Sequence, residues 1–388
     1  MKVLILSCRT GGGHDAAGMA MKEELNARGH EAVLFDYLTL AGQKVSDRVG
    51  DIYVNTVKKM PHVFGAVYQL GMVVSRITRK SPVYYVNSKM GKYMEAYLEE
   101  EQFDAILMPH LYPAETITYM KRKGAKLPLT VAIMTDYTCI PFWEETECDY
   151  YIVPHEELIK SCVKRGIPKE KLVPLGIPVS RRFRQRADKE KARVYLNFPK
   201  DRKICLLMGG SMGAGDLERL TEKLLEQAGE DYAVAVVCGS NKKIFLGLKK
   251  KYKDRENLYI IGKTNQMEVY MKACDIIYTK PGGLTSTEAA VSGIPIIHTA
   301  PIPGCESANR RFFVRQGMSL APRTTEAQVR EGIRLLDDKE RVEAMKKAQK
   351  ACIKGDSGKR IADFLEDQVY SCPEVYKDNT AEYKNTMV

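Results

Sequence analysis

Short apolar runs alternate with amphipathic stretches along most of the chain. The runs lie at 2–7, 33–35, 105–108, 129–134 and 150–153, and a second series lies at 204–208, 234–238, 259–261, 276–278 and 294–298. Runs of this length are typical of buried strands, and the stretches between them have helical periodicity. Strands separated by helices predict parallel βαβ units. We therefore expect an α/β fold made of two Rossmann-like, doubly wound domains.

The alternation is interrupted once, at about residues 176–199, where Gly-Ile-Pro-Val-Ser is followed by a charged run. Such an interruption is typical of a connection between domains, and a length of 388 residues also fits two domains. The expected parts are an N-terminal domain at 1–178, a C-terminal domain at 179–355, a closing helix at 356–370 and a polar, frayed tail at 371–388.

The composition is that of a globular protein, with 44% hydrophobic and 28% charged residues. No apolar run reaches the roughly 18 residues that span a bilayer. The apolar run at 2–6 is too short for the core of a signal peptide. The 10 cysteines include no CxxC pair, so neither a disulfide framework nor a zinc ribbon is indicated. These features favour a reducing, cytoplasmic compartment.

Lysine and arginine outnumber acidic residues by 60 to 49, which gives a formal net charge of +11. The segment 58–92 is rich in basic residues and contains no acidic one, and its apolar residues recur at helical spacing from Met60 to Tyr68. This pattern is typical of a helix at an anionic membrane surface. It is equally typical of a core-packed helix with a solvated rim, and basic balance alone often means only solubility.

A glycine turn ending in His14 follows the first expected strand and precedes a helix expected at about 15–28. Glycines allow a tight turn, and a helix N-terminus offers unpaired amides to a polar ligand. An imidazole at this place suits a general base near neutral pH, or else it only caps the helix. A nicotinamide dehydrogenase with Asp36 on the ribose is an alternative, although the turn is not a complete GxGxxG.

A richer motif, TKPGGLTSTE, runs from Thr279 to Glu288. A strand ends, a Pro-Gly-Gly turn follows, and a helix opens with hydroxyl side chains, which is an anion-binding construction. Glu288 suits hydrogen bonds from ribose hydroxyls, or else it stabilises the helix dipole. A second loop, LMGGSMG, contains Ser211 and also follows a strand. Together the two loops favour a nucleotide diphosphate.

A third segment, PIPGCESAN, places Glu306 and Asn309 one helical turn apart. A carboxylate and an amide at this spacing can bind sugar hydroxyls, and an ordinary capped helix start is the alternative. In open parallel sheets, ligands bind outside the carboxyl ends of the strands at the topological switch point. With two such domains face to face, we expect the site in the cleft between them.

Four strings, GGGH, LMGGSMG, TKPGGLTSTEAAVSGIPII and PIPGCESAN, together resemble the monogalactosyldiacylglycerol synthase and processive diacylglycerol glucosyltransferase family. Its members are relatives of the lipid II N-acetylglucosaminyltransferase. The resemblance extends to about residue 370 and implies the GT-B architecture, in which two Rossmann-like domains face a cleft. It also implies a UDP-hexose donor, held mainly by the C-terminal half, and a lipid acceptor such as diacylglycerol.

By motif position, the resemblance implies roles for individual residues. In the donor site, Gly282, Gly283, Thr285 and Ser286 hold the diphosphate with Ser211 nearby, Glu288 binds the ribose, Gly262 and Lys263 the uracil, and Glu306 and Asn309 the sugar. On the acceptor side, His14 is the expected base and lies beside Gly12 and Gly13. His110 and Asp136 each follow an expected strand. They are therefore expected to face the cleft, and the alternative is that they are ordinary turn residues. Asp136 would orient His14 or bind acceptor hydroxyls.

These expectations describe an inverting glycosyltransferase in which a histidine activates the acceptor and UDP leaves. No DxD motif occurs in the chain, so no metal is expected. The basic segment 58–92 would seat the enzyme on the inner face of the cell membrane, and no nucleic acid is expected as a partner. A UDP-sugar epimerase and a non-catalytic UDP-sugar sensor are rival interpretations of the same fold.

Overall fold

The computed structural model describes residues 1–8, 12–44, 61–78, 80–185, 188–210, 216–227, 229 and 231–371. These residues form two compact units. The first contains most of the described residues before Arg181 together with those after Gly355, and Arg181–Gly355 forms the body of the second. The division after Ser180 lies two residues beyond the boundary expected at 178. The helix expected at 356–370 is part of the first unit.

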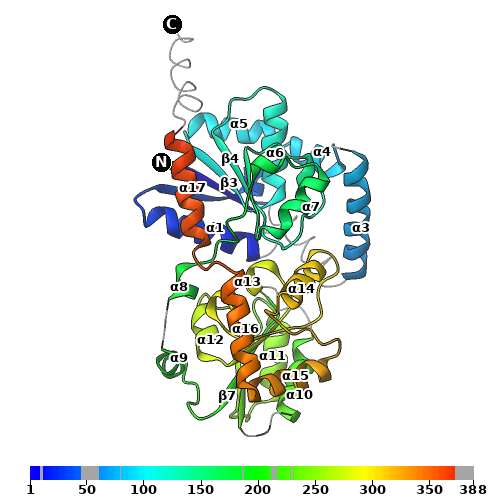
Figure 1. Cartoon of the computed structure of the whole chain (residues 1–388), viewed down its shortest axis with the longest axis vertical. Helices are drawn as coiled ribbons and strands as arrows, with labels where there is room; N and C mark the ends of the chain where they lie inside the picture. The colour runs from blue at the N-terminus through cyan, green and yellow to red at the C-terminus, as the bar shows by residue number, and fades with distance from the viewer. Residues whose placement is uncertain are drawn as a thin grey trace. The chain divides into compact units, whose positions relative to one another are not determined.

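The first unit is built on a six-stranded parallel sheet with the order β2-β1-β3-β4-β5-β6 (Figure 1). Its strands are β1 (Lys2–Ser7), β2 (Glu31–Asp36), β3 (Ala105–Met108), β4 (Leu129–Ile133), β5 (Tyr150–Ile152) and β6 (Leu172–Val173). The chain runs from β1 to β2 on one side and then crosses to β3 on the other side of β1. The switch point at which such sheets bind ligands therefore lies between the carboxyl ends of β1 and β3.

Helices cover both faces of this sheet. They are α1 (Gly12–Asn26), α3 (Pro61–Ile77), α4 (Pro82–Ser88), α5 (Gly91–Glu100), α6 (Leu111–Arg122), α7 (Glu157–Arg165) and α17 (Ser357–Ser371), with short 3₁₀ helices at Tyr37–Ala41, Trp143–Glu145 and Lys169–Lys171. On one face, Met21 of α1 and Leu365 of α17 share a core with the strands. On the other face, Met94, Ile117 and Cys162 belong to a second core. Burial on both faces explains the continuous apolar strands.

Helix α17 comes from the far end of the chain and lies beside α1 (Figure 1). Arg28, just after α1, pairs with Asp363 at 2.8 Å and with Glu366 at 3.1 Å, and His30 Nε2 lies 2.7 Å from Glu366. His30 and Arg28 hold the pKa of Glu366 below its usual range. These contacts make α17 an integral part of the first unit. Residues 372–388, nearly all of the tail expected at 371–388, lie outside the described residues.

The second unit contains a five-stranded parallel sheet with the order β11-β10-β7-β8-β9. Its strands are β7 (Lys203–Met208), β8 (Tyr232–Val237), β9 (Leu258–Ile261), β10 (Ile276–Thr279) and β11 (Ile296–His298). Here the chain extends from β7 through β8 to β9 and then returns to place β10 on the other side of β7. The switch point of this sheet therefore lies between the carboxyl ends of β7 and β10.

The helices of the second unit complete a doubly wound domain. They are α8 (Arg181–Arg184), α9 (Lys189–Tyr195), α10 (Leu217–Gln227), α11 (Lys242–Lys251), α12 (Met267–Ala273), α13 (Gly283–Ser292), α14 (Cys305–Arg315), α15 (Thr325–Asp337) and α16 (Lys339–Cys352). Leu207, Leu220, Leu248 and Met345 belong to the core on one face of the sheet. Among the described helices, none combines the length and the apolarity needed to cross a bilayer.

The sheet strands expected from the sequence are confirmed to within two residues at each end. Two local expectations differ from the structure. The short strand β6 was not expected. The first helix begins at Gly12, three residues before the expected start at 15, so the two glycines before His14 are already helical. This earlier start places His14 in the first turn of α1.

Candidate functional site

His14 is the centre of the candidate site in the first unit. It lies just beyond the end of β1, in the first turn of α1. Its Nδ1 atom is 2.7 Å from the carbonyl oxygen of Pro109, which follows β3, and 3.2 Å from Oγ1 of Thr135, which follows β4. A carbonyl oxygen can only accept a hydrogen bond, so Nδ1 is the protonated nitrogen of the neutral ring. Nε2 is then the basic nitrogen.

His110 packs against His14 as a buried, neutral imidazole. It caps the N-terminus of α6, where its Nδ1 accepts a hydrogen bond from the backbone N–H of Tyr112 at 3.1 Å. The His14 and His110 rings meet edge to face, with their centroids 4.5 Å apart. Burial, and to a lesser extent the nearby His14, holds the pKa of His110 well below its usual range. His110 is therefore a fixed neutral neighbour of His14 and does not titrate near neutral pH.

Asp136 does not orient His14 in the structure. It follows β4 and is half-buried. Among the described residues, His14 makes polar contacts with Pro109 and Thr135, and Asp136 is not one of them. The hydroxyl of Thr135, one residue earlier in the same loop, is the side-chain group that reaches the imidazole. The other role expected for Asp136, the binding of acceptor hydroxyls, stays a prediction. The main partner, the carbonyl of Pro109, is a backbone atom that no side-chain motif reveals.

The start of α13 forms the candidate anion site of the second unit. Gly282 is the N-cap residue and offers no side chain to the helix amides. The first intrahelical bond is donated by the N–H of Ser286 to the carbonyl of Gly282, at 3.0 Å. The amides of Gly283, Leu284 and Thr285 come before this first bond, so they have no acceptor within the helix. Their N–H groups point out of the helix end, where they can donate to a ligand. Thr285 is partly exposed beside them.

The side chain of Ser286 is directed away from this anion site. It is fully buried, and its Oγ lies 3.0 Å from Nε2 of His298, whose Nδ1 lies 3.0 Å from Oγ of Ser319. Burial, with a smaller effect of Arg310, lowers the pKa of His298 to about 3, so this imidazole is neutral. The Ser286 hydroxyl, which was expected to bind the diphosphate, is therefore engaged with His298 in the core instead. Neighbouring helical residues point about 100° apart, which leaves Thr285 as the hydroxyl at the surface.

Both glycine loops of the second unit meet at its switch point. Gly210, after β7, has φ +71°, and a Cβ atom at this position would lie 2.9 Å from Cε of Lys280, after β10. The left-handed backbone favours glycine at this position, and the missing Cβ leaves room for the lysine. Ser211, expected next to the diphosphate, lies outside the described residues.

Helix α14 supports the loop before α13. Glu306 forms an ion pair with Lys280 through Oε1, and its Oε2 accepts a hydrogen bond from the N–H of Ile302 at 2.8 Å. Nδ2 of Asn309 donates to the carbonyl of Pro281 at 3.1 Å. Asn309 is fully buried. The amide expected to bind a sugar is thus used to hold the loop in place, because a buried carbonyl needs a donor.

Glu288 is buried in the second turn of α13, with 9% of its surface exposed. Burial raises the pKa of Glu288 to about 8, and repulsion from Glu268 adds to the shift. Glu268 itself pairs with Arg182 at 3.3 Å. A carboxyl group with this pKa is partly protonated at neutral pH.

Gly262 and Lys263 lie at the same edge of the second sheet, after β9. Strand β9 is two strands away from β7 in the sheet, and β10 lies on the other side of β7. A Cβ atom at Gly262 would touch the ring of Phe245, 3.8 Å from its Cε2 atom. Lys263 is exposed. An aromatic side chain beside a glycine turn suits a flat base, and Phe245 was not identified from the sequence.

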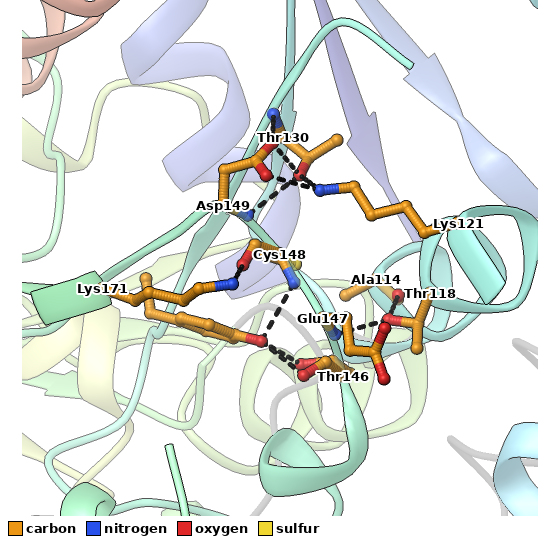
Figure 2. A network of polar contacts seen from close by, with 10 residues as sticks. Ala114, Thr118, Lys121, Thr130, Thr146, Glu147, Cys148, Asp149 and Lys171 are labelled. Atoms are coloured by element: carbon orange, nitrogen blue, oxygen red, sulfur yellow. Dashed lines mark hydrogen bonds and ion pairs between the residues drawn. The ribbon is translucent and has the colours of Figure 1, made fainter. Parts of the chain in front are cut away.

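A dense polar network in the first unit lies at the opposite edge of its sheet (Figure 2). Asp149 accepts hydrogen bonds from Nζ of Lys121 at 2.6 Å and from Oγ1 of Thr130 at 2.7 Å. The backbone N–H of Thr130 donates to the Asp149 carboxylate, and the backbone N–H of Asp149 donates to Oγ1 of Thr130. Thr130 and Asp149 lie at the amino ends of β4 and β5. Ligands bind at carboxyl ends, so this network fixes the pairing of two strands.

Two families match the two units. The chain matches the monogalactosyldiacylglycerol (MGDG) synthase family over residues 14–179 and glycosyl transferases group 1 over residues 188–351. The chain is 27% identical to a processive diacylglycerol beta-glucosyltransferase from Bacillus licheniformis over 372 residues, which are 94% of this chain and 94% of that protein.

Solved structures share the fold over nearly the whole chain. An S. aureus MnaA–UDP co-structure matches with a TM-score of 0.64 at 14% identity and covers 95% of this chain and 97% of its own. A UDP-GlcNAc 2-epimerase from Neisseria meningitidis bound to UDP-GlcNAc matches with a TM-score of 0.61 at 15% identity, over 94% and 99%. These likenesses show the fold, which is of the GT-B type. The chain therefore combines a match to monogalactosyldiacylglycerol synthase with a match to glycosyl transferases group 1, and it is similar over 94% of its length to processive diacylglycerol beta-glucosyltransferases.

Proposed function

We propose that the enzyme transfers a hexose from a UDP-sugar to a hydroxyl of a lipid such as diacylglycerol, with inversion at the anomeric carbon. The observation that carries this proposal is the hydrogen bond between Nδ1 of His14 and the carbonyl of Pro109, because it makes Nε2 a proton acceptor at a ligand-binding sheet edge. The diacylglycerol glucosyltransferase name of a full-length relative supports the acceptor class. UDP and UDP-GlcNAc in solved structures of the same fold support a UDP-sugar donor.

In the proposed reaction, Nε2 of His14 takes the proton of the acceptor hydroxyl as its oxygen attacks the anomeric carbon. The bond between that carbon and the diphosphate breaks, and its electron pair leaves with UDP. A single displacement inverts the configuration, so an α-linked donor gives a β-linked glycolipid. The neutral His110, together with Gly12 and Gly13, lines the acceptor side, and no step needs a second titrating group.

The donor would be held by the second unit. The amides of Gly283 and Thr285 and the Thr285 hydroxyl would bind the diphosphate, where the helix dipole also favours negative charge. Glu288 would accept hydrogen bonds from the ribose hydroxyls, and Glu306 would contact the hexose. In the same proposal, Gly262 and Lys263 bind the uracil, Ser211 lies near the diphosphate, and Asn309 positions the loop. We propose no metal, because amides and lysine supply the positive potential.

We further propose that the enzyme acts as a peripheral protein on the inner face of the cell membrane. Helices α3, α4 and α5 and the short connections between them expose large apolar side chains and lysines, which we propose to act together and call the α3–α5 surface: Leu70, Val73, Ile77, Tyr85, Val86, Tyr93, Lys80, Lys89 and Lys92. Ile77 and Val86 are 80% and 67% exposed. Apolar and cationic side chains together favour an anionic lipid interface. The side chains of Lys58, Lys59, Arg76 and Arg79, in the same basic segment, lie outside the described residues.

The purified enzyme can test the proposal with vesicles that contain diacylglycerol. UDP-glucose and UDP-galactose are supplied separately, UDP release is measured, and the lipid products are identified by mass spectrometry. We expect UDP release only with vesicles and a lipid whose mass increases by one or more hexoses. An epimerised nucleotide formed without vesicles would indicate an epimerase, as in the UDP-GlcNAc 2-epimerase of the same fold. UDP-sugar binding with no product would indicate a sensor.

A further inference from the structure

Lys280 has an unusual position for a lysine, because it lies between the two glycine loops at the switch point of the second sheet. It is the first residue after β10, and its Cε approaches Gly210, after β7, so closely that a Cβ there would lie 2.9 Å away. The lysine is also two residues before the N-cap of α13. A cationic side chain thus lies where both loops and the helix start present a site for an anion.

The charge of Lys280 is already balanced by Glu306. The two side chains form an ion pair and are 17% and 8% exposed. The second carboxylate oxygen of Glu306 keeps its own donor, the N–H of Ile302, at 2.8 Å. A Cβ atom at Gly282 would lie 3.9 Å from the same oxygen that contacts the lysine. The carboxylate therefore lies beside the turn at which the diphosphate is proposed to bind.

A buried ion pair contributes little net stability, because the loss of hydration opposes the attraction between the charges. A diphosphate would bring more negative charge to Lys280 than one carboxylate does. Charge-assisted hydrogen bonds to phosphate are among the strong polar contacts in proteins. The phosphate is therefore able to compete for the lysine, while Glu306 keeps its bond to Ile302.

We infer that Lys280 is exchanged between two anions during the catalytic cycle: Glu306 holds it in the free enzyme, and the diphosphate takes it when the donor binds. This inference rests on the proposed function. The ammonium group then stabilises the charge that develops on the leaving UDP. The released oxygen of Glu306 becomes free to accept hydrogen bonds from the hexose hydroxyls of the intact donor.

The exchange has a consequence for product release. With UDP bound, no hexose hydroxyl compensates Glu306, so the carboxylate competes with the diphosphate for Lys280. Glu306 therefore weakens the binding of UDP more than that of the intact donor, and it helps the product to leave. A lysine that served only to hold Glu306 in place would have no such effect on the choice between nucleotides.

Calorimetric titration of the full chain with uridine and UDP tests the exchange. Dissociation constants are compared for the wild type, Lys280→Met, Glu306→Gln, the double variant, and Lys280→Arg, which keeps the positive charge. We expect Glu306→Gln to tighten UDP binding by about threefold to tenfold, because a competing charge is removed. In the Glu306→Gln background, Lys280→Met should weaken UDP binding by about tenfold or more and change uridine binding less than about twofold.

The double variant separates the exchange from a purely structural role. If Lys280 only balances Glu306, then Lys280→Met in the Glu306→Gln background leaves UDP binding unchanged, and the inference is overturned. The inference is also overturned if Glu306→Gln alone leaves UDP binding unchanged or weakens it. This test remains available even if the lysine variants do not fold. Absence of UDP binding by the wild type would contradict the proposed function itself. Retention of most UDP affinity by Lys280→Arg supports a role of charge.

Discussion

The Nδ1 atom of His14 lies 2.7 Å from the carbonyl oxygen of Pro109, so the backbone after β3 fixes the tautomer of a side chain on α1. A carboxylate at this place would change its charge with pH and would stabilise the imidazolium ion. The backbone carbonyl orients the ring and carries no titrating charge of its own. The neutral His110 likewise adds no positive charge beside His14.

Replacement of His14 by alanine should reduce turnover by about 10²-fold to 10⁴-fold, which is the usual contribution of a general base. UDP affinity should change by less than about twofold, because the donor is proposed to bind the second unit. Glycolipid formation and UDP binding are measured on the same preparation. His155→Ala is the matched control, since this histidine follows β5 and is not part of the proposed site. Equal loss of turnover in both variants would contradict the assignment of His14.

Thr135→Val and Thr130→Val form a matched pair, because both threonines belong to β4 or its ends. Thr135 contacts His14, so its loss should lower kcat by about twofold to tenfold and leave the free energy of unfolding nearly unchanged. Thr130 is fully buried and bonds to Lys121 and Asp149, so its loss should cost about 1–3 kcal/mol of stability. Its kcat at low temperature should be normal. Denaturant titration and initial rates check the pair, and the reverse pattern would refute it.

The apolar pattern was sufficient to predict both sheets, because strands buried on two faces leave continuous runs in the sequence. Helix ends were harder to predict. The glycines at 12 and 13 indicate a turn, yet α1 begins at Gly12 despite the low helix propensity of glycine. The two-residue strand β6 was too short to leave a signal.

The positions of the candidate site residues were predicted best for residues that directly follow a strand. His14, Gly282 and Glu288 all lie at carboxyl edges of the sheets, as expected. Side-chain direction could not be read from the motif, so Ser286 was assigned to the wrong side of its helix. Long-range partners such as the carbonyl of Pro109 were missed because they come from distant segments.

Nucleotide binding should depend on pH through Glu288. Burial and Glu268 raise its pKa to about 8, so the carboxyl group is mostly protonated at pH 6 and mostly ionised at pH 9. A carboxylate is a better acceptor for ribose hydroxyls than a carboxylic acid. UDP binding should therefore tighten as the pH rises from 6 to 9, by up to about tenfold per pH unit below the pKa. Calorimetric titration across this range measures the dependence.

Glu288→Gln should abolish the pH dependence, and Glu268→Gln should move its midpoint to lower pH, because one repelling charge is removed. Stability changes in the opposite direction. The folded-state pKa lies above the ordinary 4.5, so the folded chain binds more protons between the two values. The contribution of Glu288 is fully present below about pH 4.5 and is lost as the pH rises through about 8. A midpoint that Glu288→Gln leaves unchanged would assign the titration to another group.

The α3–α5 surface should bind anionic vesicles beyond what net charge alone explains. Reversal of Lys80, Lys89 and Lys92 to glutamate should lower binding to phosphatidylglycerol vesicles by more than about 100-fold, since each lysine near the surface contributes about 1 kcal/mol and each new carboxylate is repelled by the anionic lipid. Lysines 242, 243 and 250 on α11 are the matched control, because they are exposed and their reversal removes the same formal charge.

If the lipid contact is local, the α11 variant keeps most of its vesicle binding, and only the α3–α5 variant loses glycolipid synthesis on vesicles. Both should retain wild-type UDP affinity, which shows that the donor site is intact. Ile77→Ser gives an independent test, because this side chain is 80% exposed and its loss removes apolar contact without changing charge. It should weaken vesicle binding at high salt, where electrostatic attraction is screened. Equal losses in the two lysine variants, with no effect of Ile77→Ser, would mean that net charge alone attracts the enzyme to vesicles.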